Sequence, residues 1–209
     1  MYRICEREAA NLENISILIV GVGGQGTLLT SKILGYLAKE EGYDVKVSEV
    51  HGMSQRGGNV VTYVKYGRRV YSPLIEMGEA DIIIACELLE ALRWSAYLKT
   101  GGAFIVSSQK IDPMPVIAGK MKYPANALDL VLAAHPEAMI IDALSIAERC
   151  GNKKATNIVL LGAAAVGSAF DKDKWINAIR SITPARFLDS NLKAFEEGFN
   201  EAERIINSK

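Results

Sequence analysis

The glycine-rich segment at 21–26, which directly follows an apolar run, constrains the fold of this chain more than any other feature. The run ISILIV at 15–20 is typical of a β-strand that is covered on both faces. After the glycines, Leu29, Ile33 and Leu37 recur every four residues and predict a helix with one buried stripe. A strand, a glycine turn and a helix in this order predict a Rossmann-like start to an α/β fold.

The rest of the chain continues this alternation of apolar runs and helical patterns. Further strands are predicted at 45–50, 59–66, 81–86, 103–108 and 138–142. Helices are predicted through Leu88, Leu92 and Leu98, and around 126–134, 144–150, 155–169, 173–182 and 187–206. Strands that alternate with helices predict an α/β protein built as a three-layer α/β/α sandwich.

Glycines and prolines mark the connections between these elements. Gly67-Arg68-Arg69 suits a tight turn, so 70–72 is expected to return as a hairpin partner of the preceding strand. Such a hairpin makes the sheet mixed, although mostly parallel. Gly101-Gly102 is expected to turn the chain into the next strand, and 109–125, with three prolines, is expected to be irregular.

The domain organisation predicted from these patterns is simple. Residues 1–14 show no clear periodicity and are interpreted as a polar lead-in. No linker composition or internal repeat divides the remainder, so 15–209 is expected to form a single domain.

Charge and cysteine content exclude several classes of function. Lys and Arg number 24 and Asp and Glu number 24, and this zero balance disfavours a protein that grips nucleic acid or an anionic membrane. The three cysteines stand far apart, so they predict free thiols in a reducing compartment and neither a cluster nor a zinc site. With no signal-peptide pattern at the N-terminus, a soluble cytoplasmic protein is expected.

The segment 21–26 matches the pattern G-x-G-x-x-G, and two hypotheses account for it. Gly21, Gly23, Gly24, Gln25 and Gly26 are the candidate cofactor-binding residues, because bare backbone can approach a phosphate closely at the start of a helix. Glu49, near the end of the second predicted strand, would then hold a ribose, as in NAD(P)-binding proteins. Alternatively, the glycines only allow close packing. A Walker loop is excluded, because Thr27-Leu28 follows Gly26.

A second motif, HGMSQRGGN at 51–59, has the composition of a binding loop. Its candidate site residues are Ser54, Gln55, Arg56, Gly57 and Gly58. The Arg56 guanidinium can make a forked contact with a phosphate or carboxylate, although a surface arginine in a turn is an alternative. No nucleophile–base pair or metal-ligand set accompanies the motif, and the chain has only two histidines, so no catalytic residue and no metal ligand is predicted.

Taken together, these motifs resemble one family. GVGGQGTLLTSKIL at 21–34 and EVHGMSQRGGNVVTYVKYG at 49–67 are similar to the gamma-type subunit of 2-oxoacid:acceptor oxidoreductases, and most of all to the beta subunit of indolepyruvate:ferredoxin oxidoreductases. The segments 81–108 and 157–163 extend the resemblance, which covers about 14–205.

The resemblance implies a function that this chain performs as part of a larger enzyme. Such complexes oxidatively decarboxylate an aryl 2-oxoacid, form an acyl-CoA and reduce ferredoxin. A larger alpha subunit carries thiamine diphosphate, magnesium and the iron–sulfur clusters, while the gamma-type subunit closes the active site and helps to bind coenzyme A, with no cofactor of its own. By the same resemblance, 23–26 would form the phosphate-approach loop and 54–58 would line the joint with the partner.

Two other functions remain open at the level of the sequence. One is a free-standing NAD(P)-binding protein, which G-x-G-x-x-G and Glu49 favour. The other is a structural assembly subunit whose glycine loop binds nothing. The isolated chain's affinities for NADH and for coenzyme A would separate the first from the oxidoreductase subunit.

Overall fold

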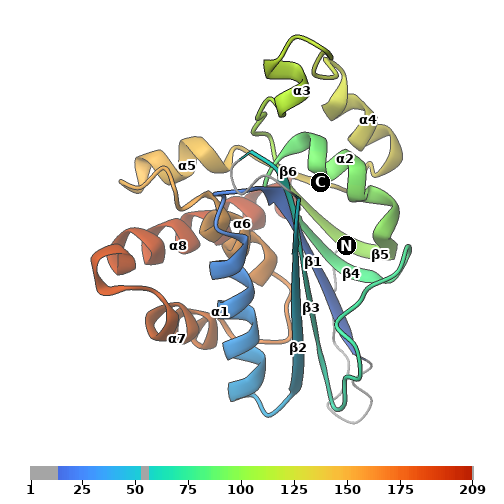
Figure 1. The fold of residues 1–209 in the computed structure, drawn as a ribbon. Coiled ribbons are helices and arrows are strands. Elements are labelled where there is room, and N and C mark those ends of the chain that lie inside the picture. Colours follow the sequence, from blue (N-terminus) through green and yellow to red (C-terminus); the bar gives the residue numbers. More distant parts are fainter. Residues whose placement is uncertain (1–13, 53–56, 209) are drawn as a thin grey trace.

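A computed structural model describes residues 14–52 and 57–208 of the chain. A six-stranded sheet with the order β2-β3-β1-β4-β5-β6 forms its centre (Figure 1). In chain order the strands are β1 (Ile15–Val22), β2 (Asp44–His51), β3 (Asn59–Gly67), β4 (Ala80–Ala85), β5 (Leu98–Ser107) and β6 (Met139–Ile141). All but one residue of the predicted lead-in at 1–14 lies outside the described residues.

The sheet is mixed, as predicted. Strands β1, β4, β5 and β6 pair in parallel, whereas β3 runs antiparallel to both β1 and β2. The helix that follows β1 therefore leads to β2, which lies one strand away from β1, and β3 fills the gap between them. Strand β1 is buried from its second residue onward, as expected for a strand with helices on both faces.

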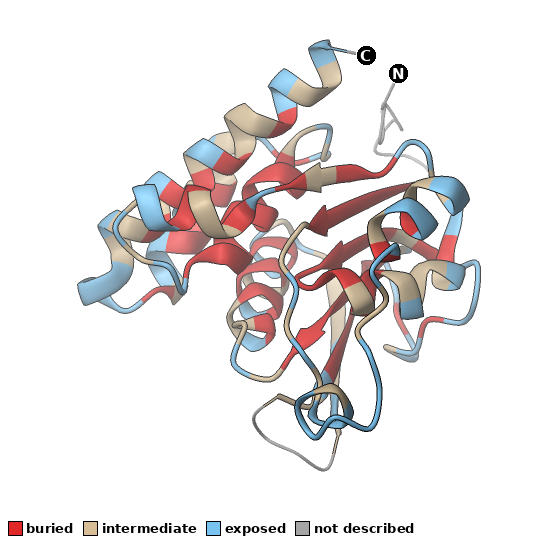
Figure 2. Cartoon of the chain, turned by 90° about the horizontal axis from the view of Figure 1, so that it is seen from above, coloured by how far each residue is buried: buried red, intermediate tan, exposed pale blue. Residues whose placement is uncertain are grey.

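Helices cover both faces of the sheet and complete the predicted three-layer sandwich (Figure 1). One face packs against α1 (Thr27–Glu40), α5 (Ala143–Arg149), α6 (Thr156–Ala165), α7 (Lys172–Ile182) and α8 (Ala185–Asn207). The other face packs against α2 (Leu88–Trp94) and α4 (Ala127–Ala134), with the single turn α3 (Met114–Ile117) beyond them. Buried residues fill the strands and the inward faces of the helices (Figure 2).

Helix α6 lies at the centre of the larger helical layer, and all ten of its residues are buried. It packs backbone to backbone on α8, because a Cβ at Gly162 would overlap the carbonyl of Phe195 and one at Gly198 would overlap that of Val159. This close contact holds the N-terminal end of α6 in place at the carboxyl edge of the sheet, where the glycine loop also lies.

The hairpin predicted from 70–72 does not form. Strand β3 has β2 on one side and β1 on the other, so neither of its edges is free for a further strand. The chain after Gly67 instead crosses the sheet as a loop, in which the Val70 N–H donates a hydrogen bond to Asp44 Oδ2 (2.8 Å) and Ile75 is buried against the sheet.

The helix and turn predicted around 88–102 also need correction. Helix α2 ends at Trp94, a short 3₁₀ turn (η1, Ser95–Tyr97) follows, and Leu98 already belongs to β5. Gly101 and Gly102 lie inside this strand, where its pairing with β4 shifts register between Ala80 and Ile82. The left-handed φ of Gly101 (78°) is typical of such a bulge, so the two glycines bend a strand and do not precede it.

Candidate functional site

The antiparallel pairing of β1 with β3 brings the two predicted motifs together. Because the strands run in opposite directions, the loop after β1 lies beside the segment that enters β3, and the Gly23 N–H donates a hydrogen bond to the Gly58 carbonyl (2.8 Å). Gly57 and Gly58 therefore border the glycine loop, whereas Ser54, Gln55 and Arg56 lie outside the described residues. The shared edge is the carboxyl end of the parallel strands, where α/β proteins bind ligands.

The loop at 23–26 presents bare backbone to its surroundings. Gly24 and Gly26 have φ angles of 102° and 80°, which a residue with a Cβ rarely adopts. A Cβ at Gly24 would meet nothing within 4 Å, so this glycine opens towards solvent. Among the described residues, the N–H groups of Gly24, Thr27 and Leu28 have no acceptor, as expected before and within the first turn of α1. These donors can face an anion.

Gln25 uses its carboxamide within the chain. Its Oε1 accepts from the Val22 N–H (2.8 Å), and its Nε2 donates to the Cys86 carbonyl (2.8 Å) and to Gln109 Oε1 (3.2 Å). The side chain therefore bridges the ends of β1 and β4. The strands that follow β1 in the chain lie on one side of this point in the sheet, and those that follow β4 lie on the other side. A Cβ at Gly21 would come within 2.8 Å of this Oε1, which explains why glycine stands there.

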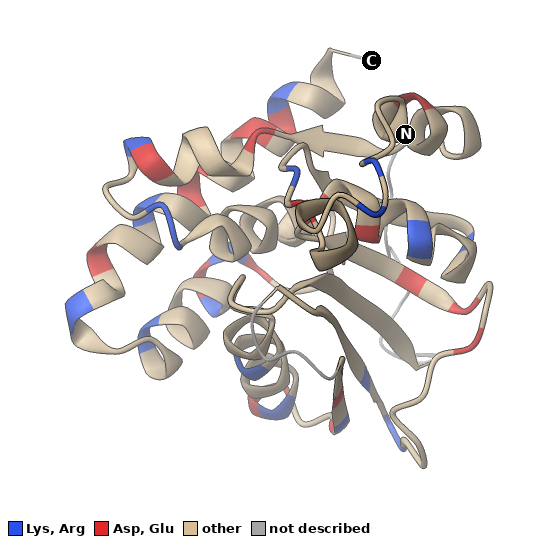
Figure 3. Cartoon of the chain, turned by 45° about the horizontal axis from the view of Figure 1, so that its top comes forward, with Lys and Arg blue, Asp and Glu red and all other residues tan. Residues whose placement is uncertain are grey.

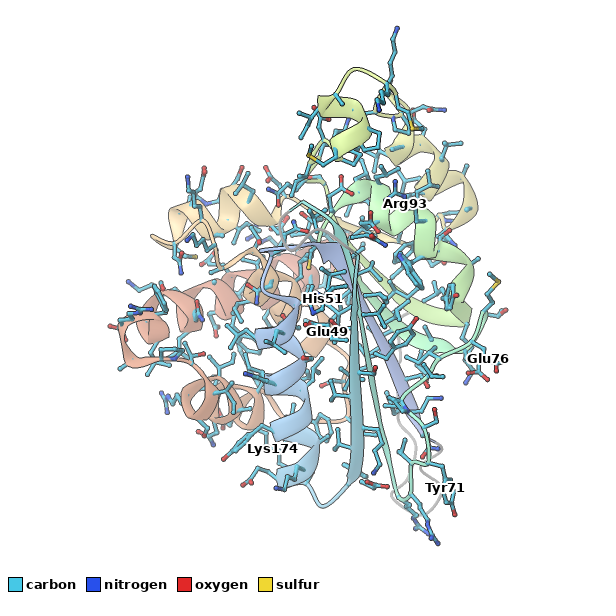
Figure 4. The ribbon with its side chains drawn as sticks, viewed as in Figure 1. Glu49, His51, Tyr71, Glu76, Arg93 and Lys174 are labelled. Carbon is cyan, nitrogen blue, oxygen red and sulfur yellow. The ribbon has the colours of Figure 1, made fainter. Side chains whose placement is uncertain are left out.

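Glu49 lies in a different environment from the ribose-binding acid of a Rossmann fold. Strand β3 separates its strand from β1, and its Oε2 accepts from Thr62 Oγ1 (2.8 Å) and Thr27 Oγ1 (3.2 Å). Its other oxygen lies 2.8 Å from His51 Nε2. Figure 4 shows Glu49 and His51 together at the end of β2, beside α1. This carboxylate holds the start of α1 against the sheet, and three side chains already engage it.

A cavity of about 340 Å³ lies next to the glycine loop. Its walls include Gly24, Gln25 and Gln109 on the sheet side and Glu148, Lys153 and Lys154 on the helical side. We call it the loop cavity. Thr156 at the start of α6 also lines it, and α6 has no side-chain cap, so its positive end faces the space. Lys153 and Lys154 were not among the predicted site residues, although the run NKKA at 152–155 directly precedes an apolar helix.

A second cavity, of about 300 Å³, lies on the other side of the motif pair. Gly57, Gly58 and Asn59 line it together with Arg93 of α2 and Lys122. Its remaining walls are apolar and come mainly from the segment 113–124, in which the Met114 and Met121 side chains are largely exposed. Figure 4 shows Arg93 on α2 beneath this segment. We call it the methionine cavity.

Two buried carboxylates support the methionine cavity from below. Glu87 caps α2 by accepting from the Glu90 N–H, and its Oε1 accepts from the Tyr123 hydroxyl (2.6 Å) and the Ile111 N–H (3.1 Å). Glu90 contacts Arg93 through Oε1, while no described residue forms a hydrogen bond with its Oε2. Burial raises the pKa of the Glu90 carboxyl against the opposing effect of Arg93. These contacts tie the segment 109–125 to α2.

The described residues include neither a metal-ligand cluster nor a membrane-spanning helix. Within 14–52 and 57–208, no three His, Cys, Asp or Glu side chains are grouped so that they could hold a metal ion. None of the helices in the described part of the chain is both long and apolar enough to cross a bilayer. Acidic and basic residues are interspersed over the helices (Figure 3).

Known proteins of one family resemble this chain in sequence and in structure. The sequence model of the pyruvate ferredoxin/flavodoxin oxidoreductase family matches residues 16–201. The chain belongs to this family. It is 38% identical over 202 residues to the indolepyruvate oxidoreductase subunit IorB of Thermococcus kodakarensis, with 93% of this chain and 99% of that protein covered.

Two further members show the same relationship. The IorB subunit of Archaeoglobus fulgidus is 39% identical over 194 residues, covering 90% of this chain and 95% of that protein. Among solved structures, the gamma subunit of a keto/oxoacid ferredoxin oxidoreductase from Geobacter sulfurreducens superposes with a TM-score of 0.69 at 26% identity, over 91% of this chain and 99% of that one. The predicted resemblance is confirmed, and the free-standing NAD(P)-binding hypothesis has no support among these relatives.

Proposed function

We propose that this chain is the gamma-type subunit of a heteromeric 2-oxoacid:ferredoxin oxidoreductase that acts on an aryl 2-oxoacid of the indolepyruvate class. The similarity to indolepyruvate oxidoreductase subunits over nearly the full length of both chains carries this proposal. The geometry agrees with it, because two glycine motifs meet at one edge of the sheet between two cavities.

A larger partner would carry the redox chemistry. Oxidative decarboxylation needs an electron sink for the carbanion and carriers for two electrons, and ordinary side chains supply neither. This chain has three cysteines and two histidines in all, too few to ligate a four-thiolate iron–sulfur cluster. We therefore assign thiamine diphosphate, magnesium and the clusters to an alpha subunit, with ferredoxin as the electron acceptor of the complex.

The loop cavity is our candidate for contact with coenzyme A. The N–H groups after Gly23, the uncapped start of α6 and the lysines at 153 and 154 all provide positive potential for a phosphate, although Glu148 on the same wall opposes it. In this arrangement Gln25 supports the loop from below, and Gly24 keeps the backbone accessible.

Substitution of Gly24 tests this assignment in the reconstituted complex. Gly24→Val places a branched side chain where the backbone must stay bare, so the KM for coenzyme A should rise at least tenfold. Gly42→Val is the matched control, since Gly42 also has a positive φ (82°) and open space but lies at the far end of α1. An unchanged KM in a folded Gly24→Val complex would remove coenzyme A from this loop.

The methionine cavity is our candidate for the joint with the alpha subunit. It combines the second glycine motif with Arg93, Lys122 and exposed methionines, and methionine-rich surfaces adapt well to a partner.

Co-purification tests the subunit assignment as a whole. A tagged chain expressed in its own cells should recover one larger protein that contains thiamine diphosphate and iron, and recovery of the chain without such a partner would contradict the proposal.

A further inference from the structure

Three large apolar side chains are exposed on the loop at 68–79, which joins β3 to β4. Tyr71 is 80% exposed, Leu74 59% and Met77 70%. We call these three side chains the Tyr71 patch. Figure 4 shows Tyr71 at the end of the sheet opposite to His51. Single exposed apolar residues are common on protein surfaces, but a group on one loop indicates a surface that another segment covers.

The loop that carries this patch is anchored to the rest of the fold. Val70 and Ile75 are each only 3% exposed and fix the loop on the sheet. The Gly78 N–H donates a hydrogen bond to the Ala96 carbonyl (3.0 Å) and fixes its far end. The exposed side chains between these anchors therefore belong to an ordered loop. A segment that docks on them does not have to order the loop as well, which favours docking.

The described part of the chain begins beside this loop. Asn14, the first described residue, lies against Gly67, where a Cβ would come within 3.0 Å of the Asn14 Cα. Residues 1–13 therefore join the sheet next to the residue at which the loop begins. Thirteen residues span at most roughly 43–47 Å, whereas Met77, ten residues beyond Gly67, lies at most roughly 36 Å from it. The segment is long enough to reach every side chain of the patch.

The composition of residues 1–13 suits this surface. The first five residues, MYRIC, include three large apolar side chains. The last eight, EREAANLE, contain three glutamates and one arginine, and the loop begins with the exposed Arg68 and Arg69. Opposite charges therefore favour contact between the acidic part of the segment and the start of the loop, which leaves the apolar part available for the patch.

We infer that residues 1–13 fold back over the loop at 68–79 and cover the Tyr71 patch. A short covalent tether holds the segment near the patch at an effective concentration on the order of millimolar, which favours it over a separate protein. The family model matches 16–201, so this docking is a feature outside the part of the chain that the model matches. The opposite edge of the sheet, with both glycine motifs, stays free for a partner. The inference does not depend on the proposed function.

Disulfide trapping in the full chain tests this inference, because Cys5 belongs to the docking segment. In Leu74→Cys, with oxidised glutathione as the electron acceptor, an intrachain disulfide should join Cys5 to the introduced thiol in most molecules. Peptide mapping without reductant detects this bond. Met121→Cys is the matched control, since Met121 is similarly exposed (65%) but lines the methionine cavity at the other edge of the sheet. It should give at least fivefold less of the corresponding bond.

Methionine oxidation measures the same cover without an introduced thiol. Dilute hydrogen peroxide should oxidise Met77 at least threefold more slowly than Met121 in the full chain, although the described residues leave both side chains similarly exposed. Ile4→Asp should remove this protection of Met77, because a charged side chain does not dock on an apolar surface. The oxidation rate of Met121 should stay unchanged in the same variant.

Other occupants of the patch would give different results, each of which would overturn the inference. Equal disulfide yields for the two cysteine variants, or equal oxidation rates for the two methionines, would show that the segment does not cover the patch. A disulfide between two chains would assign the patch to a second copy of this protein. Protection of Met77 that appears only when the larger partner is added would assign the patch to that partner.

Discussion

The side chain of Asn157 donates a hydrogen bond from Nδ2 to the backbone carbonyl of Gly26, 3.1 Å away, across 131 residues of sequence. This contact joins the start of α6 to the end of the glycine loop. Two helix N-termini, those of α1 and α6, are thereby held at the same edge of the sheet, and the loop cavity lies between the glycine loop and the start of α6. The candidate anion site depends on this long-range contact as much as on the glycines.

We predict that Gly26→Ala destabilises the fold through two separate effects. The left-handed φ of 80° costs a residue with a Cβ about 1–2 kcal/mol. In addition, the new Cβ would lie 2.9 Å from Asn157 Nδ2, and overpacking of this kind costs about 1–3 kcal/mol more. Urea unfolding should therefore show a larger loss for Gly26→Ala than for Gly42→Ala, which has a similar φ and open space.

The contact with Asn157 can be isolated by a double variant. In an Asn157→Ala background, the extra loss of Gly26→Ala over Gly42→Ala should disappear, because the obstructing carboxamide is gone. If the extra loss persisted, the Asn157 side chain would not be the obstacle.

Gln25→Leu should lower the free energy of unfolding by about 1–3 kcal/mol, because it leaves the Val22 N–H and the Cys86 carbonyl without their partner. Gln109→Leu is the control, since it removes only the longer contact of Gln25 Nε2, at 3.2 Å. Denaturant titration of both variants measures the difference. A loss for Gln109→Leu as large as that for Gln25→Leu would show that the bridge between β1 and β4 contributes little.

The buried Glu90 carboxyl predicts a specific pH dependence. Burial raises its folded-state pKa above the ordinary value of 4.5, so the native state retains a proton that the unfolded state releases. The free energy of unfolding should therefore rise, relative to Glu90→Gln, as the pH falls from neutrality through the raised pKa towards 4.5. Unfolding curves for both proteins between those limits measure this. A constant difference between the two proteins would contradict it.

Arg56→Ala tests the second motif, whose central residues lie outside the described part of the chain. If the guanidinium contacts a phosphate or carboxylate at the joint with the partner, the variant should lower the turnover of the complex at least tenfold. Its effect on the melting temperature of the isolated chain should be small. Arg69→Ala, which removes an exposed arginine after β3, is the control. A loss confined to thermal stability would assign Arg56 to the fold.

Local patterns in the sequence predicted much of the fold, because each element was marked by its own residues. The apolar run of β1, the glycines after it and the stripe through Ile33 describe a strand, a turn and a helix without reference to the rest of the chain. The prediction of a hairpin at 70–72 was wrong, because local patterns do not show which strands lie beside β3. Whether β3 has a free edge depends on which strands take the places beside it.

The candidate site, like the fold, could be predicted only in part from the sequence. The glycine motifs were visible as motifs, and their contact through Gly23 and Gly58 follows from antiparallel pairing. The roles of Asn157 and Lys154 could not be predicted, because each depends on where the start of α6 packs. The contacts of Gln25 could not be predicted either. A polar side chain within a binding motif can form hydrogen bonds with nearby backbone groups, as Gln25 does with Val22 and Cys86.

The most direct test of the central claim is ferredoxin reduction with indolepyruvate and coenzyme A, measured for this chain alone and for the chain combined with its larger partner. The account predicts no turnover by the single chain and robust turnover by the reconstituted pair in the presence of thiamine diphosphate, because the electron sink and the electron carriers belong to the partner. Turnover by the single chain without added thiamine diphosphate would contradict the assignment of this protein as a dependent subunit.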